Sequence, residues 1–183
     1  MKSILAAFVV AAISILNGCN PNSGRQSDIK NRFERIANLD HSYELPDNWI
    51  RYQSTENRFE IAIPSDDKFT DSYYVTFGPT RTFGVSNRPP MQSAEQIIAA
   101  NRGMFVGFGS VLYSTDTKNE RETTQVFGFD SGHELYQLVK IVVTDHRVYV
   151  MTVHFNGDHP DDFTDERLVT YFRSFKLTNE PTK

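Results

Sequence analysis

The sequence predicts an α+β domain built around an antiparallel sheet. Segments in which apolar and polar residues alternate follow one another in runs, and two segments with helical periodicity interrupt and end these runs. Strands that follow one another directly pair as antiparallel hairpins, whereas a parallel sheet needs strands and helices in strict alternation. An apolar N-terminal segment and then a polar segment precede this domain.

The first 18 residues have the parts of an export signal. Lys2 supplies a short positive region, and residues 4 to 16 are apolar except for Ser14. This run is shorter than the ~20 residues that a helix needs to span a bilayer. It matches the apolar region of a secretory signal peptide instead.

The only cysteine of the chain, Cys19, follows this run. "LNGC", which ends at Cys19, resembles the bacterial lipobox, although Asn17 departs from the small residue usual at its position. The resemblance implies a lipoprotein signal peptide and a Cys19 that carries acyl chains such as palmitate. The protein is then anchored in the cell envelope on the extracytoplasmic side, in the outer rather than the inner membrane where there are two. The alternative is a buried or chance cysteine behind a simple signal.

Composition excludes some classes of partner. The chain has 19 basic and 23 acidic side chains and no basic block, so nucleic acid is not expected as a partner. No second apolar run is long enough to cross a membrane. A mature chain with its one cysteine lipidated has no disulfide, and its core alone must hold the fold.

The segment after Cys19 is expected to be a tether. "NPNSGRQSD" is polar and rich in turn-forming residues. Behind it, Ile29, Phe33 and Ile36 recur at helical spacing. Two interpretations stay open: a short helix that docks on the domain, or a loosely formed spacer.

The domain is expected to open with two hairpins. "NWIRYQSTENRFEIAIPSD" predicts two strands around a turn at residues 55 to 57, since Phe59, Ile61 and Ile63 alternate with polar or small residues. "SYYVTFGPTRTFGVSNR" predicts two shorter strands around Gly78-Pro79.

A helix is expected next, within "QSAEQIIAANRGMFVGF". Ser93 and Gln96 have the spacing of a capping box, and Gly107 is expected to end the helix. Its apolar side is expected to consist of Ile97, Ile98, Met104 and Phe105.

Two further hairpins follow. "SVLYSTDTK" and "TTQVFGFDS" are joined by a charged turn at residues 119 to 121, and "ELYQLVKIVVT" and "RVYVMTVHF" by a tight turn at Asp145-His146. The last hairpin is expected at the centre of the sheet with both faces covered, because both faces are apolar. The predicted faces are Val139, Ile141 and Val143 in its first strand, and in its second Tyr149, Met151, Val153 and Phe155 on one side and Val148 and Val150 on the other.

A second helix within "PDDFTDERLVTYFRSFKL" is expected to cover one of these faces through Leu168, Phe172 and Phe175.

The motifs "W-x-x-Y-x-S-x-x-x-R-F-E-I-A-I-P", "R-V-Y-V-x-T" and "F-x-S-F-x-L" resemble the PsbP-like superfamily, between residues 47 and 177. This group includes extrinsic photosystem proteins, Ran-binding Mog proteins and DcrB-type lipoproteins. The resemblance implies an α/β/α sandwich, a central antiparallel sheet flanked by helices. It also implies a non-catalytic protein that binds another protein or assists assembly, because the family has no shared catalytic residues. Neither the partner nor an oligomeric state follows from it.

The chain is thus expected to divide into a signal peptide at 1–18, a tether at 19–44, the PsbP-like domain at 45–178 and a tail at 179–183.

No catalytic residues and no cofactor are predicted. The most suggestive polar stretch is "HFNGDHPDDF", whose candidate metal ligands are His154, Asp158, His159, Asp161 and Asp162. We interpret it as a loop and a helix N-terminus, where acidic residues favour the helix dipole. Metal binding or small-ligand binding by the anchored lipoprotein is the alternative function.

Overall fold

The computed structural model describes residues 21–38, 44–67, 74–76, 81–107, 109–132, 135–156 and 166–178. Its elements in chain order are α1 (Pro21–Asn38), β1 (Trp49–Ser54), β2 (Phe59–Pro64), β3 (Tyr74–Thr76), β4 (Arg81–Asn87), α2 (Ala94–Val106), β5 (Ser110–Lys118), β6 (Glu122–Asp130), β7 (Leu135–Thr144), β8 (Arg147–Asn156), α3 (Glu166–Ser174) and β9 (Lys176–Leu177).

A six-stranded antiparallel sheet forms the centre of the molecule, in the order β3-β4-β8-β7-β6-β5. The hairpin β7–β8 lies in its middle, and Val143 pairs with Val148 across the turn at Asp145-His146, as predicted. A smaller sheet, β1-β2-β9, contains the first predicted hairpin. The expected α+β fold with a central antiparallel sheet is therefore confirmed.

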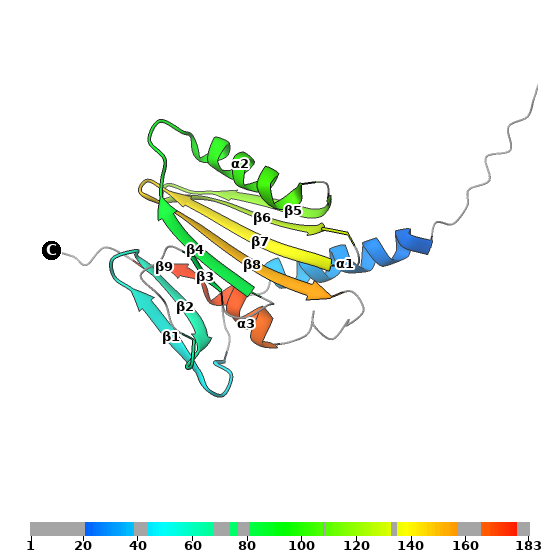
Figure 1. Cartoon of the computed structure of the whole chain (residues 1–183), viewed down its shortest axis with the longest axis horizontal. Coiled ribbons are helices and arrows are strands. Elements are labelled where there is room, and N and C mark those ends of the chain that lie inside the picture. Colours follow the sequence, from blue (N-terminus) through cyan, green and yellow to red (C-terminus); the bar gives the residue numbers. More distant parts are fainter. Residues whose placement is uncertain are drawn as a thin grey trace, which may run out of the picture.

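Helices cover both faces of the large sheet (Figure 1). Helix α2 lies on one face, against Val139, Ile141 and Val143 of β7. Helices α1 and α3 and the small sheet lie on the other face, with α1 over β5 and β6 and with α3 between β8 and β2. Both faces of β7 and β8 are apolar because both are buried, as the sequence predicts.

The start of α2 is set by its capping box. The Ser93 hydroxyl accepts a hydrogen bond from the Gln96 amide at 3.2 Å, and the Gln96 side chain accepts one from the Ser93 amide at 2.9 Å. Gly107 ends the helix with φ 51°, a conformation that glycine adopts without strain.

One prediction for the apolar side of α2 is wrong: the side chain of Met104 is 74% exposed. It lies seven residues after Ile97 and only about 20° from it around the helix, and Ile97 is 3% exposed, so the exposure of Met104 depends on its position along α2 and not on its angle.

Helix α1 is part of the core. Ile29, Phe33 and Ile36 are 5%, 0% and 3% exposed, so the docked helix is the correct alternative for this segment. It is longer than expected, because it already begins at Pro21, a residue favoured in a first helical turn. The loosely formed spacer is wrong for residues 21–38, and the packed domain begins before residue 45.

Among the described helices, none has the length and apolar character needed to cross a membrane.

Helix α3 joins the two sheets. It packs against β2 and β8, and Leu168, Phe172 and Phe175 are buried as predicted. The Ser174 hydroxyl accepts a hydrogen bond from the Ala62 amide of β2 at 2.8 Å and donates one to the Tyr171 carbonyl at 2.9 Å. Side-chain bonds thus hold the end of the helix onto the small sheet.

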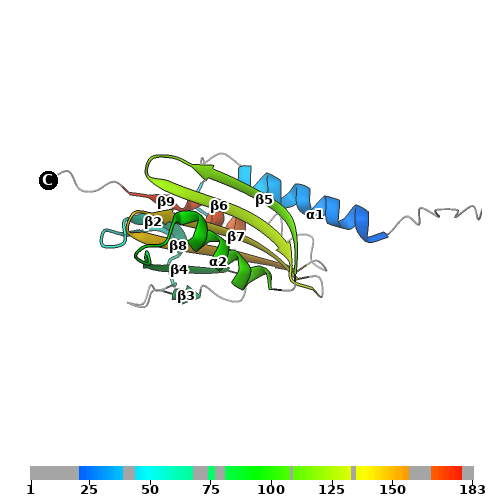
Figure 2. The ribbon, with the colours of Figure 1, turned by 90° about the horizontal axis from the view of Figure 1, so that it is seen from above.

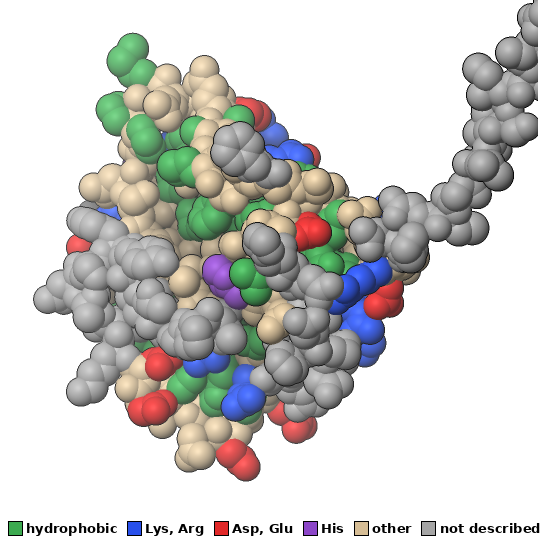
Figure 3. All heavy atoms as spheres, turned by 45° about the vertical axis from the view of Figure 1, so that its right-hand side comes forward, with side chains coloured by type: hydrophobic (Ala, Val, Ile, Leu, Met, Phe, Trp, Pro, Cys, Tyr) green, Lys and Arg blue, Asp and Glu red, His purple; other side chains and the backbone are tan. Residues whose placement is uncertain are grey.

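The surface of the described part mixes charge types. On the face drawn in Figure 3, acidic and basic side chains lie close together, and hydrophobic side chains form separate small areas between them.

Candidate functional site

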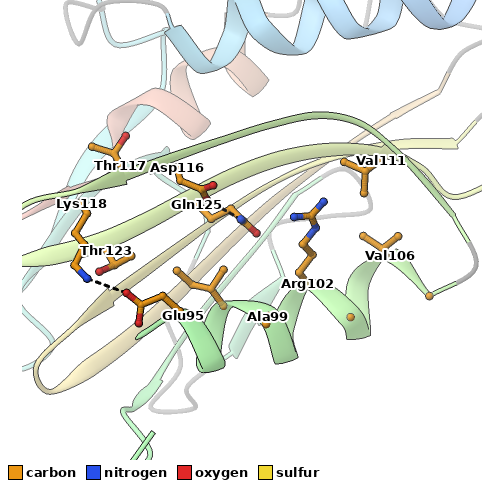
Figure 4. A pocket seen from close by; sticks show the side chains of 13 residues that line it. Glu95, Ala99, Arg102, Val106, Val111, Asp116, Thr117, Lys118, Thr123 and Gln125 are labelled. Atoms are coloured by element: carbon orange, nitrogen blue, oxygen red, sulfur yellow. Dashed lines mark hydrogen bonds and ion pairs between the residues drawn. The ribbon is translucent and has the colours of Figure 1, made fainter. Parts of the chain in front are cut away.

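A trough lies between α2 and the edge strand β5, with β6 as its floor (Figure 4). It forms because α2 packs mainly over β6 and β7, so that β5 is left beside the helix rather than under it. The volume of this α2–β5 trough is about 770 Å³. Its lining residues are Glu95, Ile98, Ala99, Arg102, Gly103, Val106, Gly107, Val111, Asp116, Thr117, Lys118, Thr123 and Gln125.

One end of the trough is bridged by an ion pair. Lys118, the last residue of β5, lies 2.8 Å from Glu95 in the first turn of α2 (Figure 4). The hydrogen bond from Lys118 is the largest cause that lowers the pKa of Glu95 to about 2, so the carboxylate stays ionised at neutral pH. Both side chains are largely exposed, and exposed pairs contribute little to stability. The bridge can therefore open at small cost.

The opposite end is closed by the turn from α2 to β5 and is apolar. Val106 and Val111 lie on the two sides of this turn, and Val111 is 36% exposed. Gly103 also lines the trough, and a Cβ atom at this position would meet no atom within 4 Å. The trough therefore has an apolar wall at this end, and the Val111 part of that wall is partly exposed to solvent.

Gln125 places an unsatisfied acceptor in the floor. The residue is 6% exposed, and its Nε2 donates to Asp116 Oδ1 at 2.6 Å. A carboxylate only accepts hydrogen bonds, so the amide nitrogen must face Asp116 and Oε1 must face away. This Oε1 is buried and has no hydrogen-bond partner among the residues that the structure describes. An unsatisfied buried acceptor costs roughly 1–3 kcal/mol.

Arg102 supplies a cation on the helix side. Its guanidinium lies 5.8 Å from the centre of the Phe127 ring, within the range of a cation–π contact. No carboxylate in the described ranges lies within ion-pair distance of Arg102. Figure 4 shows Arg102 reaching from the helix toward the sheet, on the same side as Gln125. Its charge is thus available to a ligand.

The predicted metal ligands lie mostly outside the described residues. Of them, only His154 is described, at the end of β8. Its Nε2 lies 3.3 Å from Thr152 Oγ1, and burial lowers the pKa of the imidazole, which favours its neutral form. Within the described ranges, no three side chains of the metal-binding types form a group. Asp158, His159, Asp161, Asp162 and the lipidation candidate Cys19 fall in segments that the structure does not describe.

Sequence reasoning did not find the trough. Its polar groups come from three elements, and no motif connects Arg102 in α2 with Asp116 in β5 and Gln125 in β6. The sequence contains one signal of it, which is Gln125 within the apolar strand "TTQVFGF". The alternation of side chains along a strand places Gln125 on the same face of β6 as Phe127, the face that α2 covers.

Comparison with known proteins supports the fold. No family model and no curated protein matches the sequence. Among solved structures, the solution structure of cyanobacterial PsbP (CyanoP) from Synechocystis sp. PCC 6803 matches with a TM-score of 0.52 and 11% sequence identity. The match covers 76% of this chain and 98% of that one. The chain therefore has a PsbP-like fold, and at this identity the likeness concerns the fold alone.

Proposed function

We propose that this protein is a lipid-anchored, non-catalytic accessory protein of the bacterial cell envelope that binds a partner protein on the extracytoplasmic side. The observation that carries the accessory role is the PsbP-like fold, since accessory and assembly roles are what the resemblance to that superfamily implies. The lipobox-like "LNGC" and the apolar run before it support the anchor at Cys19.

The position of α1 supports a domain that works close to a membrane. Pro21, its first residue, is two positions after Cys19 in the sequence. The first buried side chain of the helix is Ile29, and residues 24 to 28 are exposed. In Figure 2 this part of α1 projects beyond the sheet. Residues 21 to 28 rise about 12 Å along a helix axis. An anchored domain would thus stand on a short helix instead of a flexible tether.

The anchor is tested with Cys19→Ala. This variant is expected to lose labelling by a radioactive fatty acid and to remain unprocessed or become soluble. Ser27→Ala, at an exposed position of α1 outside the lipobox, is the control and is expected to label like the parent chain. A Cys19→Ala protein that is still processed normally and stays on the membrane would show that the anchor is wrong.

The partner is tested by crosslinking and affinity capture of the intact lipoprotein from its own membranes. The proposal expects one envelope protein to be enriched with the parent chain relative to an unrelated lipoprotein from the same membranes. A capture profile identical to that of an unrelated lipoprotein would contradict it.

A second candidate function is the binding of a small ligand. The α2–β5 trough favours it, because troughs of roughly 300–1,000 Å³ with an apolar wall and a few convergent polar groups are typical ligand sites.

A further inference from the structure

We propose that the α2–β5 trough binds a small zwitterion with an apolar side chain, in the class of α-amino acids and short peptides with both ends free. This inference rests on the second candidate function, small-ligand binding. It is independent of the lipid anchor at Cys19.

The floor of the trough presents hydrogen-bond acceptors, so a ligand that binds there must supply hydrogen-bond donors. Gln125 Oε1 is buried and unpaired among the described residues, and the carboxylate of Asp116 lies directly beside the same amide group. Two neighbouring acceptors are both satisfied by one group that has several N–H donors and a positive charge. A primary ammonium has three donors and that charge.

The helix side of the trough carries the positive charge of Arg102, which favours an anionic group of a ligand. The Arg102 guanidinium has a planar fork of donors, and a carboxylate fits such a fork with two parallel hydrogen bonds. The Arg102 guanidinium lies over the Phe127 ring, 5.8 Å from its centre, and this cation–π contact favours its position beside the trough before a ligand arrives.

The balance of charges favours a ligand that carries both signs. Glu95 and Lys118 neutralise each other in the ion pair at the end of the trough. This leaves Asp116 and Arg102 as the charges that a ligand must match. A purely anionic ligand would meet Asp116 and a purely cationic one would meet Arg102, and each would leave a like charge nearby.

The walls set the remaining features of the ligand. Ile98, Val106 and Val111 offer apolar surface to a side chain of the leucine or valine type. The ion pair at one end and the turn at Gly107 at the other mark the two ends of the trough. The volume of about 770 Å³ has room for a few residues at most.

The test is calorimetric titration of the full chain, purified in a mild detergent, with leucine, Leu-Leu and Leu-Leu-Leu. Saturable binding is expected for at least one of the three. Its N-acetylated form and its C-terminal amide are each expected to bind at least about tenfold more weakly, a difference of about 1.4 kcal/mol. Preference for leucine over the peptides would identify free amino acids as the source of the ligand, and the reverse would identify short peptides. No binding of any of the three, or equal binding of the blocked forms, would overturn the proposal.

Variants connect the binding to the trough. Gln125→Leu and Arg102→Leu are each expected to weaken binding at least about tenfold. With Arg102→Leu, amidation of the ligand should have no further effect. Thr124→Val is the matched control: the neighbouring Thr124 Oγ1 is also buried without a partner among the described residues, but this residue lies on the opposite face of β6. It should bind like the parent chain.

Gln125→Leu removes the unsatisfied acceptor, so it is expected to fold at least as stably as the parent. Equal binding by Gln125→Leu and Thr124→Val would show that the acceptor has no part in a site. Either negative result would leave the acyl labelling of Cys19 unchanged, so a failure here is distinct from a failure of the anchor.

Discussion

The ring of Phe33 in α1 lies against the backbone of Gly128 in β6, in the space that a side chain at residue 128 would occupy. Glycine weakens the interior of a strand, and here the close approach of a ring explains its presence. The Phe33 ring is fully buried and also contacts Phe155 of β8 at a centroid distance of 6.0 Å. This contact seats α1 on the sheet.

Gly128→Ala is therefore expected to destabilise the protein by about 1–3 kcal/mol, because the new methyl group overlaps the Phe33 ring. Phe33→Ala should cost ~3–5 kcal/mol by itself. In the Phe33→Ala background the cost of Gly128→Ala should largely vanish, which urea unfolding of the single and double variants measures. Gly103→Ala, in open space on α2, is the control and should be neutral or stabilising by up to ~1 kcal/mol. Additive costs at residues 33 and 128 would contradict the seating of α1.

Phe172→Ala is expected to cost ~3–5 kcal/mol, a large part of the 5–15 kcal/mol typical of a domain. The side chain is 1% exposed between the sheets, and the Lys140 ammonium lies 4.5 Å from its ring. Met104→Ala, at a position 74% exposed, should stay within ~0.5 kcal/mol of the parent. Equal unfolding midpoints for the two variants would show that α3 is not packed on the sheet.

Lys140 should make stability depend on pH above neutrality. Its Nζ donates to the Phe172 carbonyl in the last turn of α3 at 2.8 Å, and burial lowers the pKa of the ammonium to about 8. Above this value the folded protein has released a proton that the unfolded chain keeps until a pH of about 10.5, so the unfolded state binds more protons. The free energy of unfolding should therefore rise between pH 8 and pH 10, by up to about 3 kcal/mol.

Urea unfolding at several pH values measures this slope, and Lys140→Met should flatten it. Above pH 10 the trend should reverse, because burial raises the pKa values of Tyr113 and Tyr149 and the stability they contribute is lost as they ionise. If the parent and Lys140→Met have the same slope between pH 8 and 10, Lys140 is not desolvated in the folded protein.

Calcium or zinc is not expected to stabilise the full chain. The sequence around Asp158 and His159, which lies outside the described residues, predicts a helix start rather than a metal site, so the melting temperature should stay constant on titration. A site that binds the metal would add RT ln(1 + [L]/Kd), or ~2.7 kcal/mol at a hundredfold excess over Kd. An upward shift that Asp158→Ala or His159→Ala abolishes would establish metal binding instead.

The local patterns of the sequence were sufficient for most of the fold. The strands of β7 and β8 and their faces follow from a period of two, because successive side chains of a strand point to opposite sides. The capping box at Ser93 and Gln96 and the turn at Asp145-His146 also depend only on neighbouring residues. The helical spacing of Ile29, Phe33 and Ile36 is local too. The surface against which these three side chains pack is not encoded locally. For this reason the sequence left two alternatives open for α1.

The tertiary structure alone decided which distant residues meet. Tyr149 donates to the Asn57 carbonyl at 2.6 Å across 92 positions of the chain, and no local pattern specifies such a pair. The same holds for the trough, whose Arg102, Asp116 and Gln125 come from three elements. The predicted burial of Met104 was wrong for a related reason. Periodicity sets the angle of a side chain around a helix, but what lies beneath that turn of the helix decides whether the side chain is buried.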